Sequence, residues 1–147
     1  MALVFSGITF VKIQYENGVK EKAAVARAEK LKAEVAAALA LERIKNDVSW
    51  VPDGYFAGPS DKSLAWKWIR GADYDCYSCR YWTVEVIARD GCTNGVSGEI
   101  NIERNGIVVD NAYDSLSYLA AGQTGRLTFV HYREGSYTGD LIELECR

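Results

Sequence analysis

The four cysteines carry the widest range of possible chemistry in this chain. They are Cys76, Cys79, Cys92 and Cys146, and the first two form a Cys-x-x-Cys motif. A zinc site would need a second closely spaced pair, which the other two cysteines do not supply. A thioredoxin-type redox centre would need a helix after the motif, where a strand beginning near Arg80 is expected. An even cysteine count in a small β domain favours structural disulfides, with free thiols as the remaining alternative.

The expected strand directions select a pairing of these cysteines. If successive strands alternate in direction, Cys92 and Cys146 lie at one end of the β domain, and Cys76 and Cys79 lie at the other. A nine-residue strand is about 30 Å long, whereas a disulfide joins Cα atoms within about 7 Å. The predicted bridges are therefore Cys76–Cys79 and Cys92–Cys146, worth about 2 and 4 kcal/mol by loop-closure arithmetic.

The remaining titratable side chains form no recognisable catalytic set. His131 is the only histidine and lies within an expected strand, so we expect it to be structural. Asp53, Asp61, Asp73 and Asp75 lie on loops near glycine, but their spacing fits no calcium-binding loop. We therefore expect no catalytic residues, no metal site and no cofactor, and we do not expect an enzyme.

Composition narrows the possible partners. The chain has 147 residues, is 48% apolar and carries a net charge of −3. A nucleic-acid-binding domain would normally carry a basic stripe, so we expect no nucleic-acid partner. No apolar run approaches the roughly 20 residues that span a bilayer, so no membrane span is expected. The length is that of one domain, or of a small domain with an appendage.

The chain divides into two parts of different composition near Asp47. Residues 1–47 hold 8 basic and 6 acidic side chains, and residues 48–147 hold 9 and 14. All 4 cysteines, all 4 tryptophans and both prolines lie in the second part. The predicted domains are an N-terminal docking or oligomerisation segment over 1–47, an aromatic connector over 48–63 and a β-sandwich over 64–147.

The N-terminal segment is predicted to be a strand followed by a long helix. The β-branched and aromatic residues over 3–15 are typical of a strand. No basic residue precedes the apolar start and no small-x-small site follows it, so we expect no secretory signal in this chain. Residues 20–45 consist largely of strong helix formers. The apolar stripe of this helix comprises Ala24, Ala28, Leu31, Val35 and Ala38.

This stripe has two possible uses, because its alanines favour a closely approaching neighbour. The helix either pairs with a protein partner, including another copy of the chain, or lies against its own β domain. The strong leucine heptads of a coiled coil are missing. The interaction segment is therefore expected to lie within residues 1–46.

The second part is predicted to be an antiparallel, immunoglobulin-like β-sandwich. Apolar and polar residues alternate from Leu64 on, with turn signals every 8 to 12 residues. Asn105-Gly106 is the strongest hairpin signal, because both central residues of a type I′ turn need positive φ. The expected strands cover 64–69, 81–88, 98–104, 107–110, 126–132 and 141–146.

The aromatic and cysteine spacing over residues 60–147 resembles that of a known class of domains. Its elements are Leu64-Ala65-Trp66-Lys67-Trp68, Cys79-Arg80-Tyr81-Trp82, Asp90-Gly91-Cys92, Gly122-Gln123 and Leu144-Glu145-Cys146. They are similar to small sandwich domains of the FxLYD type in actinobacterial envelope or secreted proteins. The resemblance implies an immunoglobulin-like sandwich used for display or binding, without a family active site.

These features together favour a non-enzymatic display or assembly protein. Its N-terminal segment would bind a partner or further copies, and the disulfide-braced sandwich would face outward, for example on a virion surface. A cell-envelope or secreted module that binds protein or carbohydrate is the first alternative, with Tyr74 and Tyr77 as possible contacts. A thiol–disulfide oxidoreductase that uses Cys76 and Cys79 is the second alternative.

Overall fold

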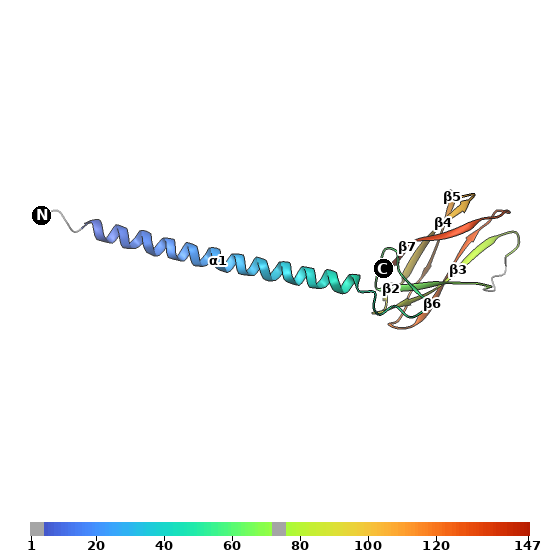
Figure 1. Ribbon diagram of the computed structural model, residues 1–147, viewed down its shortest axis with the longest axis horizontal. Helices are drawn as coiled ribbons and strands as arrows, with labels where there is room; N and C mark the ends of the chain where they lie inside the picture. The colour runs from blue at the N-terminus through green and yellow to red at the C-terminus, as the bar shows by residue number, and fades with distance from the viewer. Residues whose placement is uncertain (1–4, 72–75) are drawn as a thin grey trace. The chain divides into compact units, whose positions relative to one another are not determined.

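The part of the chain that the structure describes folds as one long helix and seven strands, whose arrangement is drawn in Figure 1. This computed structural model describes residues 5–71 and 76–147, with side chains of the helix described from Gly18 on. The helix is α1 (Phe5–Asn46), with 42 residues. The molecule divides into two compact units, Met1–Ile44 and Lys45–Arg147. This division lies close to the change in composition at Asp47.

Helix α1 ends where the sequence supplies a competing turn. Its last residue is Asn46, and the carboxylate of Asp47 accepts the backbone N–H of Ser49 at 2.9 Å. An aspartate that binds the backbone two residues ahead forms a turn that interrupts helical bonding. The backbone N–H of Val51 then donates to the carbonyl of Val48, which closes the next turn. The helix therefore ends within one residue of the position that the composition indicates.

The strand predicted over 3–15 is wrong from Phe5 on, because this stretch belongs to α1. A strand needs a neighbouring strand to satisfy its backbone, whereas a helix makes its hydrogen bonds locally. Residues 20–45 form a strong helix, and the preceding residues extend it. Gly18 lies inside α1 and does not end an element. Side-chain preference for strands was therefore overridden by the helix that follows.

The strands form two antiparallel sheets that pack as a sandwich (Figure 1). One sheet has the order β1-β2-β3-β6 and the other has the order β5-β4-β7. The strand bounds are β1 (Phe56–Ala57), β2 (Leu64–Ile69), β3 (Arg80–Ala88), β4 (Val96–Arg104), β5 (Ile107–Leu116), β6 (Thr124–His131) and β7 (Thr138–Cys146).

The predicted antiparallel sandwich is confirmed. All strand pairs that the structure describes are antiparallel, and six strands lie where alternation predicts them. The seventh, β1, lies inside the expected connector over 48–63. Counted without the two-residue β1, β3 is the second strand and pairs with the fifth, β6, as the second and fifth strands do in the immunoglobulin order. The architecture is thus immunoglobulin-like, with β1 as an added edge strand.

The core lies between the two sheets and follows the predicted alternation. Val84, Val86 and Leu127 are fully buried, as are Ile100 and Ile102 on the opposing sheet. Burial of one such side chain stabilises the fold by roughly 1.5 to 3 kcal/mol. The tryptophans of the inward faces, Trp66, Trp68 and Trp82, are half-buried and pack against this cluster.

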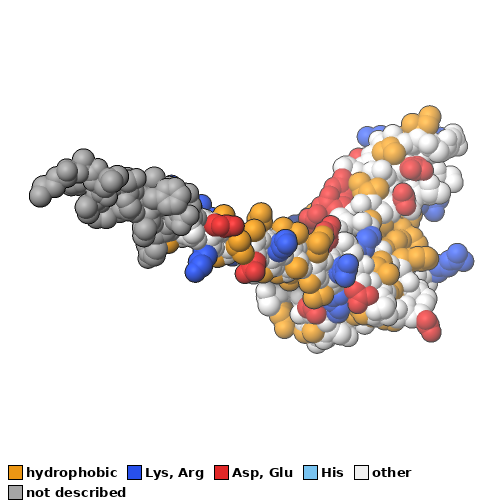
Figure 2. Space-filling view, turned by 60° about the vertical axis from the view of Figure 1, so that its left-hand side comes forward, with side chains coloured by type: hydrophobic (Ala, Val, Ile, Leu, Met, Phe, Trp, Pro, Cys, Tyr) orange, Lys and Arg blue, Asp and Glu red, His pale blue; other side chains and the backbone are white. Residues whose placement is uncertain are grey.

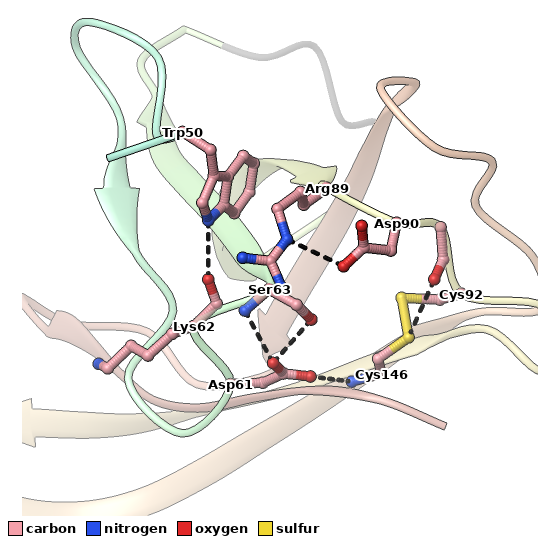
Figure 3. Close-up of polar contacts among 9 residues, drawn as sticks. Trp50, Asp61, Lys62, Ser63, Arg89, Asp90, Cys92 and Cys146 are labelled. Carbon is pink, nitrogen blue, oxygen red and sulfur yellow. Dashed lines mark hydrogen bonds and ion pairs between the residues drawn. A yellow bond between two sulfur atoms is a disulfide. The ribbon is translucent and has the colours of Figure 1, made fainter. Parts of the chain in front are cut away.

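The segment before β2 is fixed to the sandwich (Figure 3). The indole N–H of Trp50 donates to the carbonyl of Lys62 at 3.0 Å. The Asp61 carboxylate accepts the backbone N–H and the hydroxyl of Ser63 at 2.9 and 2.7 Å. Its other oxygen accepts the backbone N–H of Cys146 at 3.4 Å. The aromatic connector therefore packs on the β domain, as its composition indicates.

Candidate functional site

The two cysteine pairs lie at opposite ends of the sandwich, as expected. Cys92 and Cys146 are bonded with Cα atoms 5.3 Å apart, and Cys76 and Cys79 with Cα atoms 5.9 Å apart. Cys92 is buried and pairs by its backbone with Leu119. The Cys92–Cys146 bridge, drawn in Figure 3, connects the end of β7 to the loop after β3. Two disulfides are typical of proteins that mature in an oxidising compartment.

The Cys76–Cys79 bridge lies in a tight loop that leads directly into a strand. Ser78 has a φ of 57°, and Arg80 is the first residue of β3. The helix N-terminus that lowers the thiol pKa in thioredoxin-type centres does not follow this motif. Tyr77 is 98% exposed, whereas Tyr74 lies outside the described residues. The loop therefore presents one of the two predicted tyrosine contacts to solvent.

Helix α1 exposes its side chains throughout its described length. Every residue from 19 to 49 is exposed, including Leu31 at 61% and Val35 at 51%. Figure 2 shows apolar side chains alternating with charged ones along this part of the helix. The residues of the predicted stripe, Ala24, Ala28, Leu31, Val35 and Ala38, are thus all exposed. In water most helices gain their stability by packing such a face against a neighbour.

The apolar surface widens toward the C-terminal part of α1. Residues 35–41 read Val-Ala-Ala-Ala-Leu-Ala-Leu, which is seven apolar residues in succession. At 3.6 residues per turn, seven residues go almost twice around the helix. Leu39 and Leu41 are 52% and 60% exposed. A helix that is apolar all round is normally buried on more than one side.

A groove of about 620 Å³ opens between the sheets at the end of the sandwich that holds the Cys76–Cys79 bridge. Its walls come from the end of β2, the beginning of β3 and the beginning of β7. The lining includes the aromatic side chains of Trp68, Trp82 and Tyr137, together with Arg70, Arg80 and Gly139. Pockets of this size, with aromatic walls and a few polar groups, commonly bind small ligands.

Gly139 gives this groove its shape. A Cβ atom at Gly139 would lie 3.0 Å from the indole ring of Trp82, so a larger residue would push this ring away from β7 by a few tenths of an ångström. Trp82 is consequently held across the gap between the two sheets. Alternation in the sequence placed Trp82 on the inward face of its strand, but gave no sign of its contact with Gly139.

The charged side chains among the described lining residues are both basic. Arg70 and Arg80 are exposed, and the Nε–H of Arg80 donates to the carbonyl of Gly135 at 2.9 Å. The guanidinium of Arg104 lies 5.9 Å from the ring centroid of Tyr137, a cation–π distance. This concentration of positive charge contrasts with residues 48–147 as a whole, which hold 9 basic and 14 acidic residues.

His131 lies next to the groove, behind Tyr137. It is 3% exposed, and its Nδ1 lies 3.3 Å from a carboxylate oxygen of Asp110. Its ring meets that of Tyr137 edge-on, with the centroids 4.6 Å apart. Its Nε2 is buried with no hydrogen-bond partner in the described part of the chain. The sequence places His131 in a strand, but does not indicate its pairing with Asp110.

The loop aspartates do not form a cation site among the residues described. Asp61 binds backbone and hydroxyl donors, and residues 5–71 and 76–147 contain no cluster of three possible metal ligands. Asp73 and Asp75, singled out in the sequence, lie outside the described residues. Of the four aspartates singled out in the sequence, the two that are described, Asp53 and Asp61, thus belong to no such cluster.

A polar cluster lies on the outer face of the first sheet. The Tyr55 hydroxyl donates to the carboxylate of Glu85, and Lys67 lies 2.9 Å from the same oxygen. The hydrogen bond from Tyr55, followed by that from Lys67, lowers the pKa of Glu85. Hydrogen bonding to Tyr55 and then to Glu85 raises the pKa of Lys67. Because these bonds stabilise the charged forms, we interpret the cluster as a surface brace.

Comparison with known protein families, curated proteins and solved structures found no match to this chain. The resemblance to FxLYD-type domains therefore stays a prediction. No helix among the described residues is long and apolar enough to cross a membrane. Two surfaces are left as candidates for function: the exposed face of α1 and the basic aromatic groove.

Proposed function

We propose that this protein is a non-enzymatic structural protein that associates with copies of itself through α1 and presents its disulfide-braced sandwich for display. The observation that carries the proposal is the complete exposure of residues 19–49, with apolar side chains throughout. Exposure of so much apolar helix surface to water is unfavourable. Burial of each large apolar side chain in an interface would stabilise the protein by roughly 1.5 to 3 kcal/mol.

A second copy is the partner that these features favour. The helix of 42 residues is about 63 Å long at 1.5 Å per residue, so that two copies side by side offer a long contact. The alanines among its apolar residues allow helices to approach closely. The helix also carries side chains of both charges, such as Lys30 and Glu34, whose charged atoms are 3.9 Å apart. Helices of neighbouring copies could therefore form ion pairs with each other. Symmetric homo-oligomers are the commonest assemblies of soluble proteins.

The run over 35–41 favours a bundle over a two-stranded pair. A pair of helices covers one stripe on each, whereas this run is apolar around its whole circumference. Three or more copies would cover it more completely. An outward-facing sandwich on such a bundle fits a particle or cell-envelope surface, including that of a virion, and the two disulfides support an extracellular location.

Light scattering after size-exclusion chromatography tests the assembly. We expect the full chain to run as an oligomer and the double substitution Leu31→Glu with Val35→Glu to shift it to monomer. The matched control, Ala23→Glu with Ala26→Glu, adds the same charge to the same helix away from the predicted stripe and should leave the oligomer. Circular dichroism checks that both variants stay folded. A wild-type chain that is monomeric at every concentration overturns the proposal.

A further inference from the structure

We propose that the groove at the Cys76–Cys79 end of the sandwich binds a saccharide that carries carboxylate groups. The site is independent of helix α1, because all its described lining residues belong to the β domain. It therefore adds a ligand to a protein whose proposed function requires none.

The aromatic walls select for a ring-shaped partner. Trp68, Trp82 and Tyr137 line the groove and are half-buried, so that each is fixed by the core on one side and open on the other. Trp82 in particular is held against Gly139. Rigid aromatic rings give large contact area at low entropic cost, and the C–H faces of a pyranose ring stack on such surfaces.

The charges select for an anion. Both charged side chains in the described lining are arginines, and the guanidinium of Arg104 lies over Tyr137 at 5.9 Å. A guanidinium carries five N–H donors, and the bond from Arg80 to Gly135 uses the one at Nε. That bond fixes the plane of the group at the rim. A planar guanidinium held in this way can form two parallel hydrogen bonds to a carboxylate, which the compact ammonium group of a lysine does not form.

The free strand edges beside the groove are short. They are residues 80–82 of β3, which pair with β6 but not with β2, and Thr138 and Gly139 at the start of the edge strand β7. A peptide that extends a sheet pairs along a run of free backbone groups, and these two stretches give it little to pair with inside the groove. Recognition here depends on side chains at strand ends. A sugar ring with a carboxylate matches the combination of flat apolar walls and a basic rim.

A glycan array with uronic-acid, sialic-acid and neutral oligosaccharides, probed with the full chain, tests the proposal. We expect binding to acidic glycans, followed by calorimetry on the best of them. Arg80→Gln should weaken that binding by about tenfold, since charged hydrogen bonds are the strong ones. Arg133→Gln removes an exposed arginine outside the described lining and should change affinity little.

A second variant separates the walls from the rim. Trp82→Phe keeps an apolar ring but shortens the stacking surface, and should weaken acidic-glycan binding while near-ultraviolet circular dichroism shows a folded sandwich. Binding to neutral glycans alone, binding to acidic peptides in place of glycans, acidic-glycan binding unchanged in Arg80→Gln, or no binding on the array each overturns the inference. None of these outcomes bears on the oligomeric state.

Discussion

The hydroxyl of Ser60 bonds both backbone groups of Leu144, donating to its carbonyl at 3.0 Å and accepting from its N–H at 2.9 Å. The Ser60 side chain thus satisfies the backbone N–H and carbonyl of Leu144, as a neighbouring strand would do at this point of β7. Strand β7 is an edge of its sheet, and unpaired edges invite pairing with other chains. Together with the bond from Cys146 to Asp61, this contact closes the last part of that edge.

Loss of this contact should destabilise the sandwich. Ser60→Ala leaves the N–H and carbonyl of Leu144, a buried residue, without their partner, and we expect a loss of about 1 to 3 kcal/mol in the free energy of unfolding. Urea denaturation followed by tryptophan fluorescence measures it. Ser136→Ala, at an exposed loop position, is the control and should change the midpoint little. Equal midpoints for the two variants would contradict the role of Ser60.

The two disulfides should contribute unequally to stability. They close loops with sequence separations of 54 and 3, which loop-closure arithmetic converts to about 4 and 2 kcal/mol. Replacing Cys92 and Cys146 by alanine should therefore lower the urea midpoint more than replacing Cys76 and Cys79 by serine. The same or a larger loss from the Cys76–Cys79 pair would show that the short loop organises the fold.

Local alternation predicted most of the sandwich because strands between two sheets must turn every second side chain inward. Leu64, Trp66 and Trp68 share the inward face, as expected, and the alternating strand directions placed the cysteines correctly. The two-residue strand β1, in which Phe56 pairs with Trp66, was not predicted. Two residues are too few to show the alternation of apolar and polar side chains. The helical character of residues 5–15 was missed because strand preference in side chains is weak against continuation of a helix.

The groove could not be predicted because its residues are far apart in the sequence and come together only once the strands are arranged in the two sheets. Trp68, Arg80 and Tyr137 come from three separate parts of the chain, and nothing local in their surroundings indicates that β7 lies across from β2 and β3. The pairing of His131 with Asp110 has the same origin. The apolar stripe of α1, by contrast, depends only on helical spacing and was read directly from the sequence.

Acid should weaken the brace on the outer face of the first sheet. The pKa of Glu85 is lowered from its ordinary value of 4.5 by its bonds to Tyr55 and Lys67. A lowered pKa contributes stability that is present above the ordinary value and is lost as pH falls through the folded-state pKa. Glu85→Gln should thus be less stable than wild type by about 1 kcal/mol at pH 7, and the difference should shrink below pH 4.5.

Urea titrations at several pH values check this dependence. Tyr55→Phe removes the hydrogen bond that contributes most to lowering the pKa of Glu85, and should reproduce part of the effect. Glu145→Gln, at an exposed position on the other sheet, serves as the control. A stability difference between wild type and Glu85→Gln that stays constant from pH 7 to well below pH 4.5 would rule out the brace.

Two glycines with positive φ should differ sharply in their tolerance of alanine. Gly95 has a φ of 96°, and a Cβ atom there would lie 2.0 Å from the backbone oxygen of Leu116. Gly122 has a φ of 70° with nothing within 4 Å of the added atom. Gly122→Ala should therefore cost only the conformational strain, about 1 to 2 kcal/mol. Gly95→Ala adds a clash with rigid backbone between β4 and the end of β5, so we expect a loss above about 3 kcal/mol. Thermal and urea unfolding of both variants measure the difference, and similar losses would mean that Leu116 can move away at little cost.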